Sequence, residues 1–320
     1  MGVGWVLEAR RWASPLRVPF RGLGERRGWL VRGELGWGEF SPFPDYDDAA
    51  ASRWLAATFE AACLGWPAPA RAEVPVNLIV PAVGPARARE LVLASGGCRT
   101  AKVKVAQRTG GALEPLDVEV ARLAAVRSAL DELFGPGVGR IRVDANGAWT
   151  VPQAVDHLRE LDAIAVGLEY AEQPCATVEQ LAELRRALSR AGIAVPVAAD
   201  ESIRQAADPR RVKALGAADI VVLKVAPLGG VRACLELAEQ LALPVVVSSA
   251  LESSIGLAAG VALAGALPEL PYACGLGTAS LIVDDVVVDP MRPVNGTLPV
   301  LAADDARLVP KPSANRSSAA

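Results

Sequence analysis

The fold is indicated most clearly by Arg140–Thr150, "RIRVDANGAWT", after which, one residue later, the helical pattern "PQAVDHLRELDA" occupies residues 152–163. A short apolar strand ends at Asp144, a turn follows, and an amphipathic helix then leads away from it. Apolar strands that alternate with such helices are typical of a parallel sheet covered by helices. We therefore expect this unit to be one of a series of β/α repeats.

The same order of strand, turn and helix recurs on both sides of this unit. Further helical patterns occupy residues 116–135 and 177–192. The strand candidates are "VPVNLIV" (74–80), "AKVKV" (101–105), "RIRVDA" (140–145), "VGLEYAEQP" (166–174), "VPVAADES" (195–202), "DIVVLKV" (219–225), "PVVVSSA" (244–250) and "PYACGL" (271–276). Eight strands in about 200 residues favour an α/β barrel of the TIM type over an open doubly wound sheet.

The two ends of the chain differ from this repeat. Residues 2–13 and 28–42 each read as a strand, joined by a short loop at residues 14–27, and a helix is expected from Asp47 to about Cys63. "GWPAPARAEVP" (65–75) looks like a domain boundary. After Gly277, "LIVDDVVVDPMRPVNG" (281–296) predicts a strand followed by turns, and "KPSANRSSAA" (311–320) has a disordered composition.

Composition narrows the class of protein. The 320 residues carry a net charge of −3, so no basic field exists to hold a polyanion and we expect no nucleic-acid partner. The five cysteines are odd in number and form no C-x-x-C pair, which indicates reduced thiols. The longest apolar run, residues 255–267, is too short to span a bilayer. With no signal-peptide layout at the start, we expect a cytoplasmic protein with no membrane partner.

Polar residues recur where the predicted barrel strands end. The successive strand ends carry Asp144, Glu172, Asp200, Lys224 and Ser248. The first two intervals are 28 residues each and the next two are 24 each. One β/α unit takes about that many residues, so these side chains are expected at equivalent depths, converging on the mouth of the barrel where barrel enzymes keep their chemistry.

The three carboxylates predict a metal site. Asp144, Glu172 and Asp200 cannot all ionise cheaply side by side without a cation, and hard oxygen ligands suit Mg²⁺, with Mn²⁺ as a substitute. Taken singly, Asp144 and Asp200 would each serve as a helix cap. Three carboxylates in register, flanked by lysines on both sides, favour the metal.

Two lysines in "AKVKV" point the same way, because side chains alternate along a strand. The simplest alternative is an edge strand with a solvated face. In the barrel, however, Lys102 and Lys104 would flank the carboxylates from one side and Lys224 from the other. Two ammonium groups about 7 Å apart repel by about 2.4 kcal/mol at an effective dielectric of about 20, which lowers the pKa of a lysine towards the range of a general base.

The motifs "KVK", "DANGAW", "AEQP", "ADES", "LKV" and "SSALESSIG", in this order and spacing, resemble those of the enolase superfamily, muconate-lactonising subgroup. The resemblance covers nearly the whole chain. It implies a modified (β/α)7β barrel at residues 73–280 and an α+β capping domain made of residues 1–72 and 281–320. Within the subgroup, "GWGEFSPFPDY" (36–46) and "SSALESSIG" (248–256) look most like the o-succinylbenzoate synthases of menaquinone biosynthesis.

The resemblance also implies roles. Asp144, Glu172 and Asp200 would bind Mg²⁺, Lys104 would be the base, Lys102 would assist electrostatically and Lys224 would stabilise the anionic intermediate. The substrate, a small carboxylate, would be 2-succinyl-6-hydroxy-2,4-cyclohexadiene-1-carboxylate, which loses water in a syn elimination to give o-succinylbenzoate. The alternative is an N-acylamino acid racemase or dipeptide epimerase that uses the same metal and both opposed lysines. A catalytically inactive barrel used for binding is the third hypothesis.

The other polar residues near the strand ends and on the helices have the following expected roles. Asn146, Ser248 and Ser249 follow strand ends and are expected to contact the substrate, whereas Ser253 and Ser254 serve equally well as helix caps. Glu201 is expected to pair with a lysine. Arg21 would meet a substrate carboxylate or remain a solvated charge. The single histidine, His157, is expected as a surface or semi-exposed residue of a helix, so neither a His-Asp base nor a Ser-His-Asp hydrolase has a candidate here.

Overall fold

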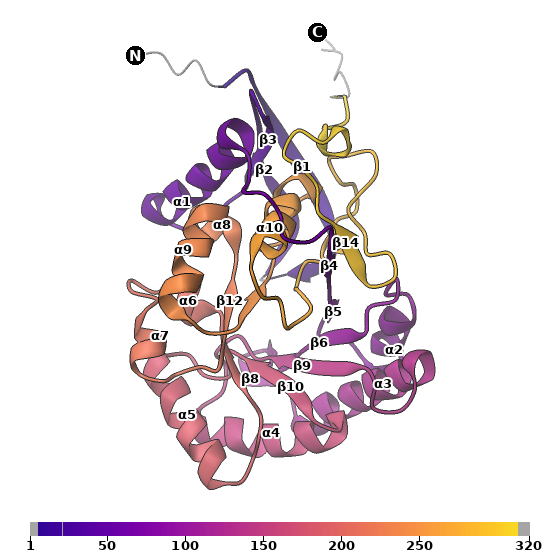
Figure 1. Ribbon diagram of the computed structural model, residues 1–320. Helices are drawn as coiled ribbons and strands as arrows, with labels where there is room; N and C mark the ends of the chain where they lie inside the picture. Colours follow the sequence, from indigo (N-terminus) through magenta and orange to yellow (C-terminus); the bar gives the residue numbers. More distant parts are fainter. Residues whose placement is uncertain (1–5, 21, 313–320) are drawn as a thin grey trace.

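Seven parallel strands curl into a barrel in this computed structural model, which describes residues 6–20 and 22–312 (Figure 1). Their order in the sheet is β13-β12-β11-β10-β9-β6-β5. The strands are β5 (Leu78–Val80), β6 (Thr100–Lys104), β9 (Arg140–Asp144), β10 (Leu168–Glu172), β11 (Val197–Ala199), β12 (Ile220–Leu223) and β13 (Val245–Val247). The predicted α/β barrel is thus confirmed, with strands close to the predicted positions.

The eighth predicted strand, "PYACGL", is reduced to two bridging residues. Cys274 bridges to Val76, and Gly275 bridges to Ser248, both in the parallel sense. These two residues close the barrel between its first and last strands. The first predicted strand, residues 74–80, is split: β4 (Glu73–Pro75) pairs antiparallel with β14 (Thr297–Pro299), and only β5 belongs to the barrel. Proline at position 75 has no amide hydrogen, which limits how far one continuous ladder extends here.

The helices follow the strands as the repeat predicts and cover the outside of the barrel (Figure 1). They are α2 (Pro85–Leu93), α3 (Leu116–Phe134), α4 (Val151–Ala165), α5 (Val178–Arg190), α6 (Glu201–Arg204), α7 (Arg211–Ala214), α8 (Val225–Leu228), α9 (Val231–Leu241) and α10 (Ser254–Ala266). A hairpin of β7 (Arg108–Thr109) and β8 (Ala112–Leu113) lies between β6 and α3. Thr150 and Thr177 begin α4 and α5 with capping boxes, which fixes where each helix starts.

Along the barrel strands, every second side chain points into the barrel. Tyr170, Ala198, Val222 and Val246 belong to one buried cluster inside the barrel. Each lies two residues before a predicted site residue at the end of its strand or one residue beyond it, the spacing that puts two side chains on the same face of a strand. Arg142, two residues before Asp144 on β9, joins this buried layer, with its guanidinium 4.6 Å from the centre of the Tyr170 ring.

A three-stranded antiparallel sheet and one helix form the N-terminal part. Its elements are β1 (Glu8–Phe20), β2 (Leu23–Gly33), β3 (Gly36–Phe40), α1 (Asp48–Phe59) and the π-helix η1 (Glu60–Leu64). The helix was predicted, but the two predicted strands are three, because residues 28–42 form a hairpin. The predicted loop at residues 14–27 is wrong, since most of these residues extend β1 and β2.

The C-terminal segment runs alongside this sheet. It contains the 3-10 helices η2 (Ala279–Leu281) and η3 (Ala306–Leu308) as well as β14. The strand predicted in residues 281–296 is wrong: Ile282 and Val287 make only isolated bridges, to Leu16 and Pro310. The amide of Asp284 donates to the hydroxyl group of Ser14, and the amide of Val287 donates to the carboxylate of Asp285. These two amides therefore bind side chains and not the backbone of a neighbouring strand. The disorder predicted for residues 311–320 falls almost entirely outside the described residues, and the proposed domain boundaries stay predictions.

Buried polar groups join the sheet to the barrel. Glu39 of β3 accepts hydrogen bonds from the backbone of Ser253 (3.0 Å) and Gly256 (3.1 Å) at the start of α10. Arg26 of β2 donates to the carbonyl oxygen of Leu251 at 3.1 Å. A carboxylate at a helix N-terminus satisfies the unpaired amides and interacts favourably with the helix dipole. These contacts place the N-terminal sheet over the mouth of the barrel.

The same junction predicts a pH effect on stability. Burial, and after it the charge of Glu39, raises the pKa of Glu252 from its ordinary value of 4.5 to about 7. The folded protein therefore binds this proton more tightly than the unfolded chain, so the stabilisation is complete below about pH 4.5 and is lost as the pH rises towards 7. A shift of this size corresponds to roughly 3 kcal/mol.

We expect Glu252→Gln to be more stable than the wild type by about 1–3 kcal/mol at pH 8 and equally stable at pH 4.5. Glutamine keeps an oxygen for the amide of Ala250, which Glu252 binds at 2.8 Å, but cannot ionise. Urea denaturation at both pH values measures the difference. Glu236→Gln, on an exposed part of α9, is the matched control. An equal difference at both pH values would contradict the assignment.

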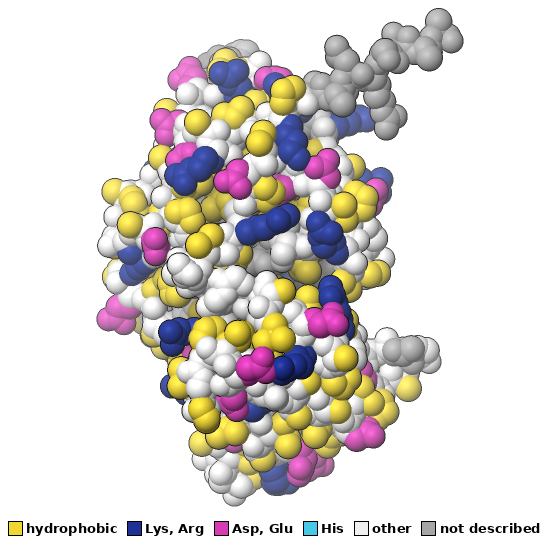
Figure 2. Space-filling model, turned by 90° about the vertical axis from the view of Figure 1, so that its right-hand side faces the viewer, with side chains coloured by type: hydrophobic (Ala, Val, Ile, Leu, Met, Phe, Trp, Pro, Cys, Tyr) yellow, Lys and Arg dark blue, Asp and Glu magenta, His cyan; other side chains and the backbone are white. Residues whose placement is uncertain are grey.

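Three general expectations can be compared with the described residues. All five cysteines are free, as predicted, and four of them are buried. No helix in residues 6–20 and 22–312 is long and apolar enough to cross a membrane. On the face shown in Figure 2, basic and acidic side chains are interspersed, in keeping with the small net charge.

Candidate active site

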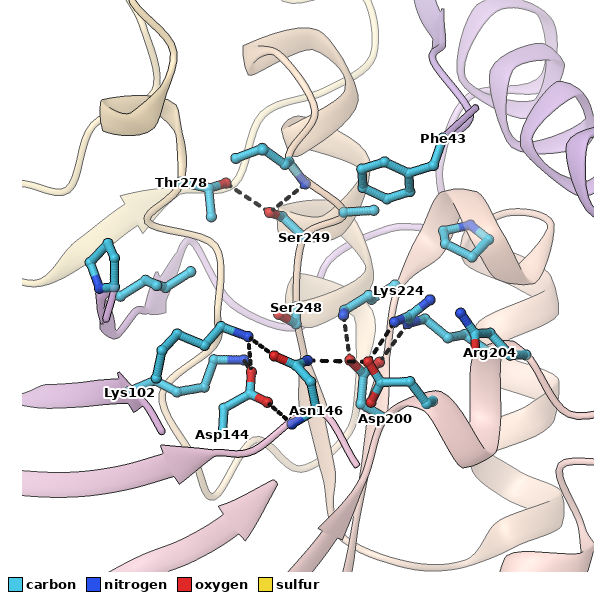
Figure 3. Close-up of a pocket in the computed structure, with 18 of the residues that line it drawn as sticks. Phe43, Lys102, Asp144, Asn146, Asp200, Arg204, Lys224, Ser248, Ser249 and Thr278 are labelled. Atoms are coloured by element: carbon cyan, nitrogen blue, oxygen red, sulfur yellow. Dashed lines mark hydrogen bonds and ion pairs between the residues drawn. The ribbon is translucent and has the colours of Figure 1, made fainter. Parts of the chain in front are cut away.

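A cavity of about 660 Å³ opens at the mouth of the barrel, beneath the N-terminal part. Its wall comes from both parts of the chain: Val18, Phe43 and Tyr46 from the N-terminal part, and the ends of the barrel strands with the loops that follow them. Figure 3 shows Lys102, Asp144 and Asn146 on one side of this cavity and Asp200, Arg204 and Lys224 on the other. The regular spacing of the strand ends therefore does bring these side chains together.

Asp144 lies between two ammonium groups. Its Oδ2 atom is 2.6 Å from Lys104 Nζ and 3.1 Å from Lys102 Nζ, and its side chain is 1% exposed. Although burial by itself would raise the pKa of Asp144, the two lysines hold it well below its usual range. Asp144 thus stays ionised at neutral pH.

Glu172 and Asp200 continue the row of carboxylates. Glu172 Oε1 is 2.7 Å from Lys102 Nζ, and Asp200 Oδ2 is 2.6 Å from Lys224 Nζ. Burial raises the pKa of Glu172 to about 7; Lys102 opposes this, whereas the charge of Asp144 adds to it. Burial also acts on Asp200, but the cations beside it lower its pKa. The helix-cap alternative fails for Asp200, whose side chain makes no capping bond to α6.

The donor set fits a hard divalent cation. Within the described residues no group of three His, Cys, Asp or Glu side chains is arranged to hold a metal ion, and Lys102 pairs with both Asp144 and Glu172. Yet Glu172 Oε2 is buried and has no hydrogen-bond partner. An unpartnered carboxylate oxygen beside two more buried carboxylates is what one additional cation would satisfy, and oxygen-only ligands suit Mg²⁺. Asp144, Glu172 and Asp200 are the residues that would hold it.

The pKa of Lys102 is shifted upwards, whereas the repulsion between two lysines, considered from the sequence, would lower it. Burial would lower its pKa, but the charges of Glu172 and Asp144 raise it well above the ordinary value. The carboxylates therefore outweigh the repulsion between the two lysines. Lys102 is held as a permanent cation, which suits an electrostatic role and not that of a base.

Strained turns surround the mouth. Among the described residues, four other than glycine adopt a positive φ within four residues of the end of a barrel strand: Ala106 (56°), Asn146 (47°), Gln173 (40°) and Leu251 (65°). This backbone conformation costs free energy for residues with a side chain, and such strain clusters at functional sites, where the surroundings hold it. Two of these four residues, Asn146 and Leu251, line the cavity.

Sequence reasoning missed two residues that hold Asp200. Arg204 donates to Asp200 Oδ1 at 3.0 Å and to the hydroxyl of Tyr46 at 2.8 Å, which ties the site to the N-terminal part. Gln173 accepts from the backbone amides of Asp200 (3.0 Å) and Ser202 (3.1 Å). An arginine four residues after an aspartate at a helix start was a visible signal, since such residues share a helix face.

The other predicted residues fall into two groups. Asn146, Ser248 and Ser249 line the cavity, and Asn146 Oδ1 accepts from Lys104 Nζ at 2.7 Å. Their role towards the substrate stays a prediction. Ser253 caps α10, and Ser254 donates to Asp285 at 2.8 Å, so neither lines the cavity.

The expectations for Glu201, His157 and Arg21 have three different outcomes. Glu201 pairs with Arg204 at 2.7 Å and not with a lysine. His157 is a semi-exposed residue of α4, as predicted, and its ring also packs against Trp149 with Nδ1 3.0 Å from the buried carboxylate of Glu119. Arg21 lies outside the described residues.

Comparisons with known proteins agree with this arrangement. Residues 85–304 match the family described as enolase C-terminal domain-like, and residues 12–62 match the enolase N-terminal domain-like family. The chain is 60% identical over 298 residues to the o-succinylbenzoate synthase of Thermobifida fusca, covering 93% of this chain and 89% of that one. It is 50% identical to the o-succinylbenzoate synthase of Mycobacterium ulcerans, over 92% of this chain and 85% of that one.

Solved structures share the fold at low sequence identity. The L-Ala-D/L-Glu epimerase of Bacillus subtilis superposes with a TM-score of 0.73 at 21% identity, covering 92% of this chain and 95% of that one. A muconate lactonizing enzyme of Pseudomonas fluorescens gives 0.73 at 20% identity, over 93% and 94% of the two chains. At such identities the likeness establishes a barrel with an N-terminal capping domain and no particular reaction.

Proposed function

The chain belongs to the enolase superfamily and, within it, to the o-succinylbenzoate synthase family, and from this premise we propose that it dehydrates 2-succinyl-6-hydroxy-2,4-cyclohexadiene-1-carboxylate to o-succinylbenzoate in menaquinone biosynthesis. The observation that supports this most directly is that Lys104 and Lys224 line one cavity and pair with different carboxylates, Lys104 with Asp144 and Lys224 with Asp200. A substrate ring between them would present its two faces to two different ammonium groups.

Charge balance supports a dianionic substrate. Among the described residues, the site holds four carboxylates and four cations: Asp144, Glu172, Asp200, Glu201, Lys102, Lys104, Lys224 and Arg204. The protein alone is therefore close to neutral here. A divalent cation together with a substrate that carries two carboxylates keeps that balance, which limits the electrostatic cost of binding both in a buried site.

Members of this superfamily use a divalent metal, and here we propose Mg²⁺, with Mn²⁺ as a substitute, held by Asp144, Glu172 and Asp200. When bound, the cation supplies Lewis-acid stabilisation of the charge that develops on the substrate carboxylate. The chain's own residues move the proton. Lys104 Nζ takes the proton from the carbon that bears the carboxylate, and the electron pair of that C–H bond enters the carboxylate as an enediolate.

The second half of the reaction uses the same lysine. Collapse of the enediolate breaks the C–O bond to the neighbouring hydroxyl group, which leaves as water with the proton that Lys104 carries. Because both events take place on one face, the elimination is syn. Lys102 remains a cation beside the carboxylates, and Lys224 stabilises the anionic ring from the opposite face.

Substitution of Lys224 separates this reaction from two-base racemisation. Arginine keeps the positive charge but cannot exchange a proton near neutral pH. We expect Lys224→Arg to retain about tenfold more dehydration activity than Lys224→Ala, since a charge-assisted contact is worth about 1.5 kcal/mol. Steady-state assays with the cyclohexadiene acid give kcat and KM for both variants. Equal losses in the two variants would contradict a purely electrostatic role for Lys224.

Because the bulk of arginine affects that comparison, the wild type provides a second measurement. Incubated in D₂O with one enantiomer of an N-succinylamino acid, a dedicated synthase should incorporate little deuterium at the α-carbon. Rapid exchange with inversion of configuration, followed by NMR and chiral chromatography, would instead establish the racemase.

A further inference from the structure

The turn that follows the proposed base is strained. Lys104 is the last residue of β6, and Ala106, two residues later, has a φ of 56° and is 3% exposed. Alanine in this left-handed conformation costs about 1–2 kcal/mol. A buried turn of this kind persists only where its surroundings hold it, so the groups that hold it bear on where Lys104 lies.

One face of α3 holds both sides of this turn. Glu119 Oε1 accepts the amide of Ala106 at 2.6 Å, and Arg122 Nη1 donates to the carbonyl oxygen of Lys104 at 3.0 Å. Glu119 and Arg122 are three residues apart and therefore share a face of the helix. Between them, the amide of Val105 donates to the carbonyl oxygen of Asp144 at 3.1 Å. The backbone around the base is thus fixed from two neighbouring elements.

These two side chains are themselves held in place. Glu119 is fully buried, and its Oε2 lies 3.0 Å from Nδ1 of His157 on α4. Arg122 is 1% exposed and binds both oxygens of Glu114, at 2.9 Å and 2.5 Å. Buried ion pairs are often no more stabilising than apolar residues of the same volume, so stability alone is a weak reason for this arrangement.

We propose that Glu119, Arg122 and His157 are positioning residues that set the orientation of Lys104 from behind the barrel. None of the three lines the cavity or belongs to the proposed metal site. The inference rests on the proposed function, in which Lys104 moves the proton. Proton transfer requires the lysine nitrogen within hydrogen-bond reach of the substrate carbon, and a displacement of about 1 Å can cost on the order of a hundredfold in rate.

The test compares two substitutions at Glu119. Glu119→Leu removes the acceptor for the amide of Ala106, and we expect kcat to fall about tenfold to a hundredfold while KM changes by less than about twofold. Glu119→Gln keeps an oxygen for that amide and presents an NH₂ group to His157, which can accept in its other tautomer. We expect this conservative variant to recover kcat to within about threefold of the wild type.

The matched control is Asp162→Leu. Asp162 of α4 accepts the amide of Leu168 at 2.7 Å, which is the same kind of helix-to-strand bond at the opposite end of the barrel. We expect it to lower the melting temperature and leave kcat unchanged. Folded Glu119→Leu with wild-type kcat, or an equal loss of kcat in both Leu variants, would overturn the proposal.

Two further measurements complete the design. If Glu119→Leu does not fold, His157→Phe replaces it, because phenylalanine keeps the packing against Trp149 and removes only the contact to Glu119. We expect this variant to have a kcat about threefold lower than the wild type and an unchanged KM. An unchanged kcat would overturn the proposal. Lys104→Ala is assayed alongside. Activity in Lys104→Ala would refute the proposed function itself, whereas an inactive Lys104→Ala with a fully active Glu119→Leu would refute only the positioning role.

Discussion

Replacement of Lys104 by alanine is expected to lower kcat by about 10²–10⁴-fold while KM changes by less than about threefold. The lysine would act twice, first as the base that takes the α-proton and then as the acid that protonates the leaving hydroxyl group. Both contributions arise in transition states and not in the bound ground state, so the loss falls on kcat. The upper part of the range is therefore the more reasonable expectation.

The structure indicates that this variant will keep its fold. Lys104 pairs with Asp144, but Lys102 lies 3.1 Å from the same carboxylate oxygen and continues to neutralise it. Removal of Lys104 therefore leaves no buried carboxylate without a cation. Circular dichroism and thermal melting would verify this before the kinetics are interpreted.

Lys213→Ala is the control, because Lys213 is an exposed lysine on α7 whose ammonium group contacts only the carbonyl oxygen of Gln240 among the bonds described. It should retain wild-type kcat. If Lys104→Ala kept more than about a tenth of kcat, the loss would be under about 1.4 kcal/mol and Lys104 would not be the essential base.

Removal of the divalent cation is expected to abolish turnover reversibly. After prolonged dialysis against EDTA, activity should fall to background, and Mg²⁺ or Mn²⁺ should restore it. The physical reason is that Glu172 keeps one buried carboxylate oxygen without a hydrogen-bond partner, with the buried carboxylates of Asp144 and Asp200 close enough to influence its pKa. Undiminished activity in excess chelator would contradict the metal site.

Binding can be measured separately from activity. Mn²⁺ titrated into the chelated protein should show a single site by electron paramagnetic resonance. Glu172→Gln should weaken Mn²⁺ binding by about tenfold to a hundredfold or more, because it removes a ligand charge. Glu169→Gln, three residues earlier on β10 and bonded to Arg142 instead, is the matched control and should bind Mn²⁺ as the wild type does. Equal affinity in the Glu172 variant would exclude that residue as a ligand.

The sequence by itself determined the architecture and the ring of polar residues at the mouth. Both depend on local periodicity: strands alternate with helices, and side chains two residues apart on a strand share a face. Because parallel strands begin their loops at one edge of the sheet, the regular spacing from Asp144 to Ser248 already implied that these side chains converge. No tertiary information was needed for that step.

Only the tertiary structure decided the features that depend on contacts between distant segments. The strand predicted at residues 271–276 is reduced to single bridges at Cys274 and Gly275, and local strand propensity does not encode that reduction. Glu39 reaches the start of α10 more than 200 residues away, and Glu119 reaches the turn after Lys104 from a neighbouring helix. A local pattern does not show which buried carboxylate will meet which amide.

The direction in which the pKa of Lys102 is shifted also depends on the tertiary structure. From the sequence, two neighbouring lysines should lower each other's pKa. In the folded protein Lys102 lies between Glu172 and Asp144, and their charges raise its pKa instead. A pKa is the sum of burial and of every nearby charge, and that sum exists only once strands far apart in the chain have been brought together.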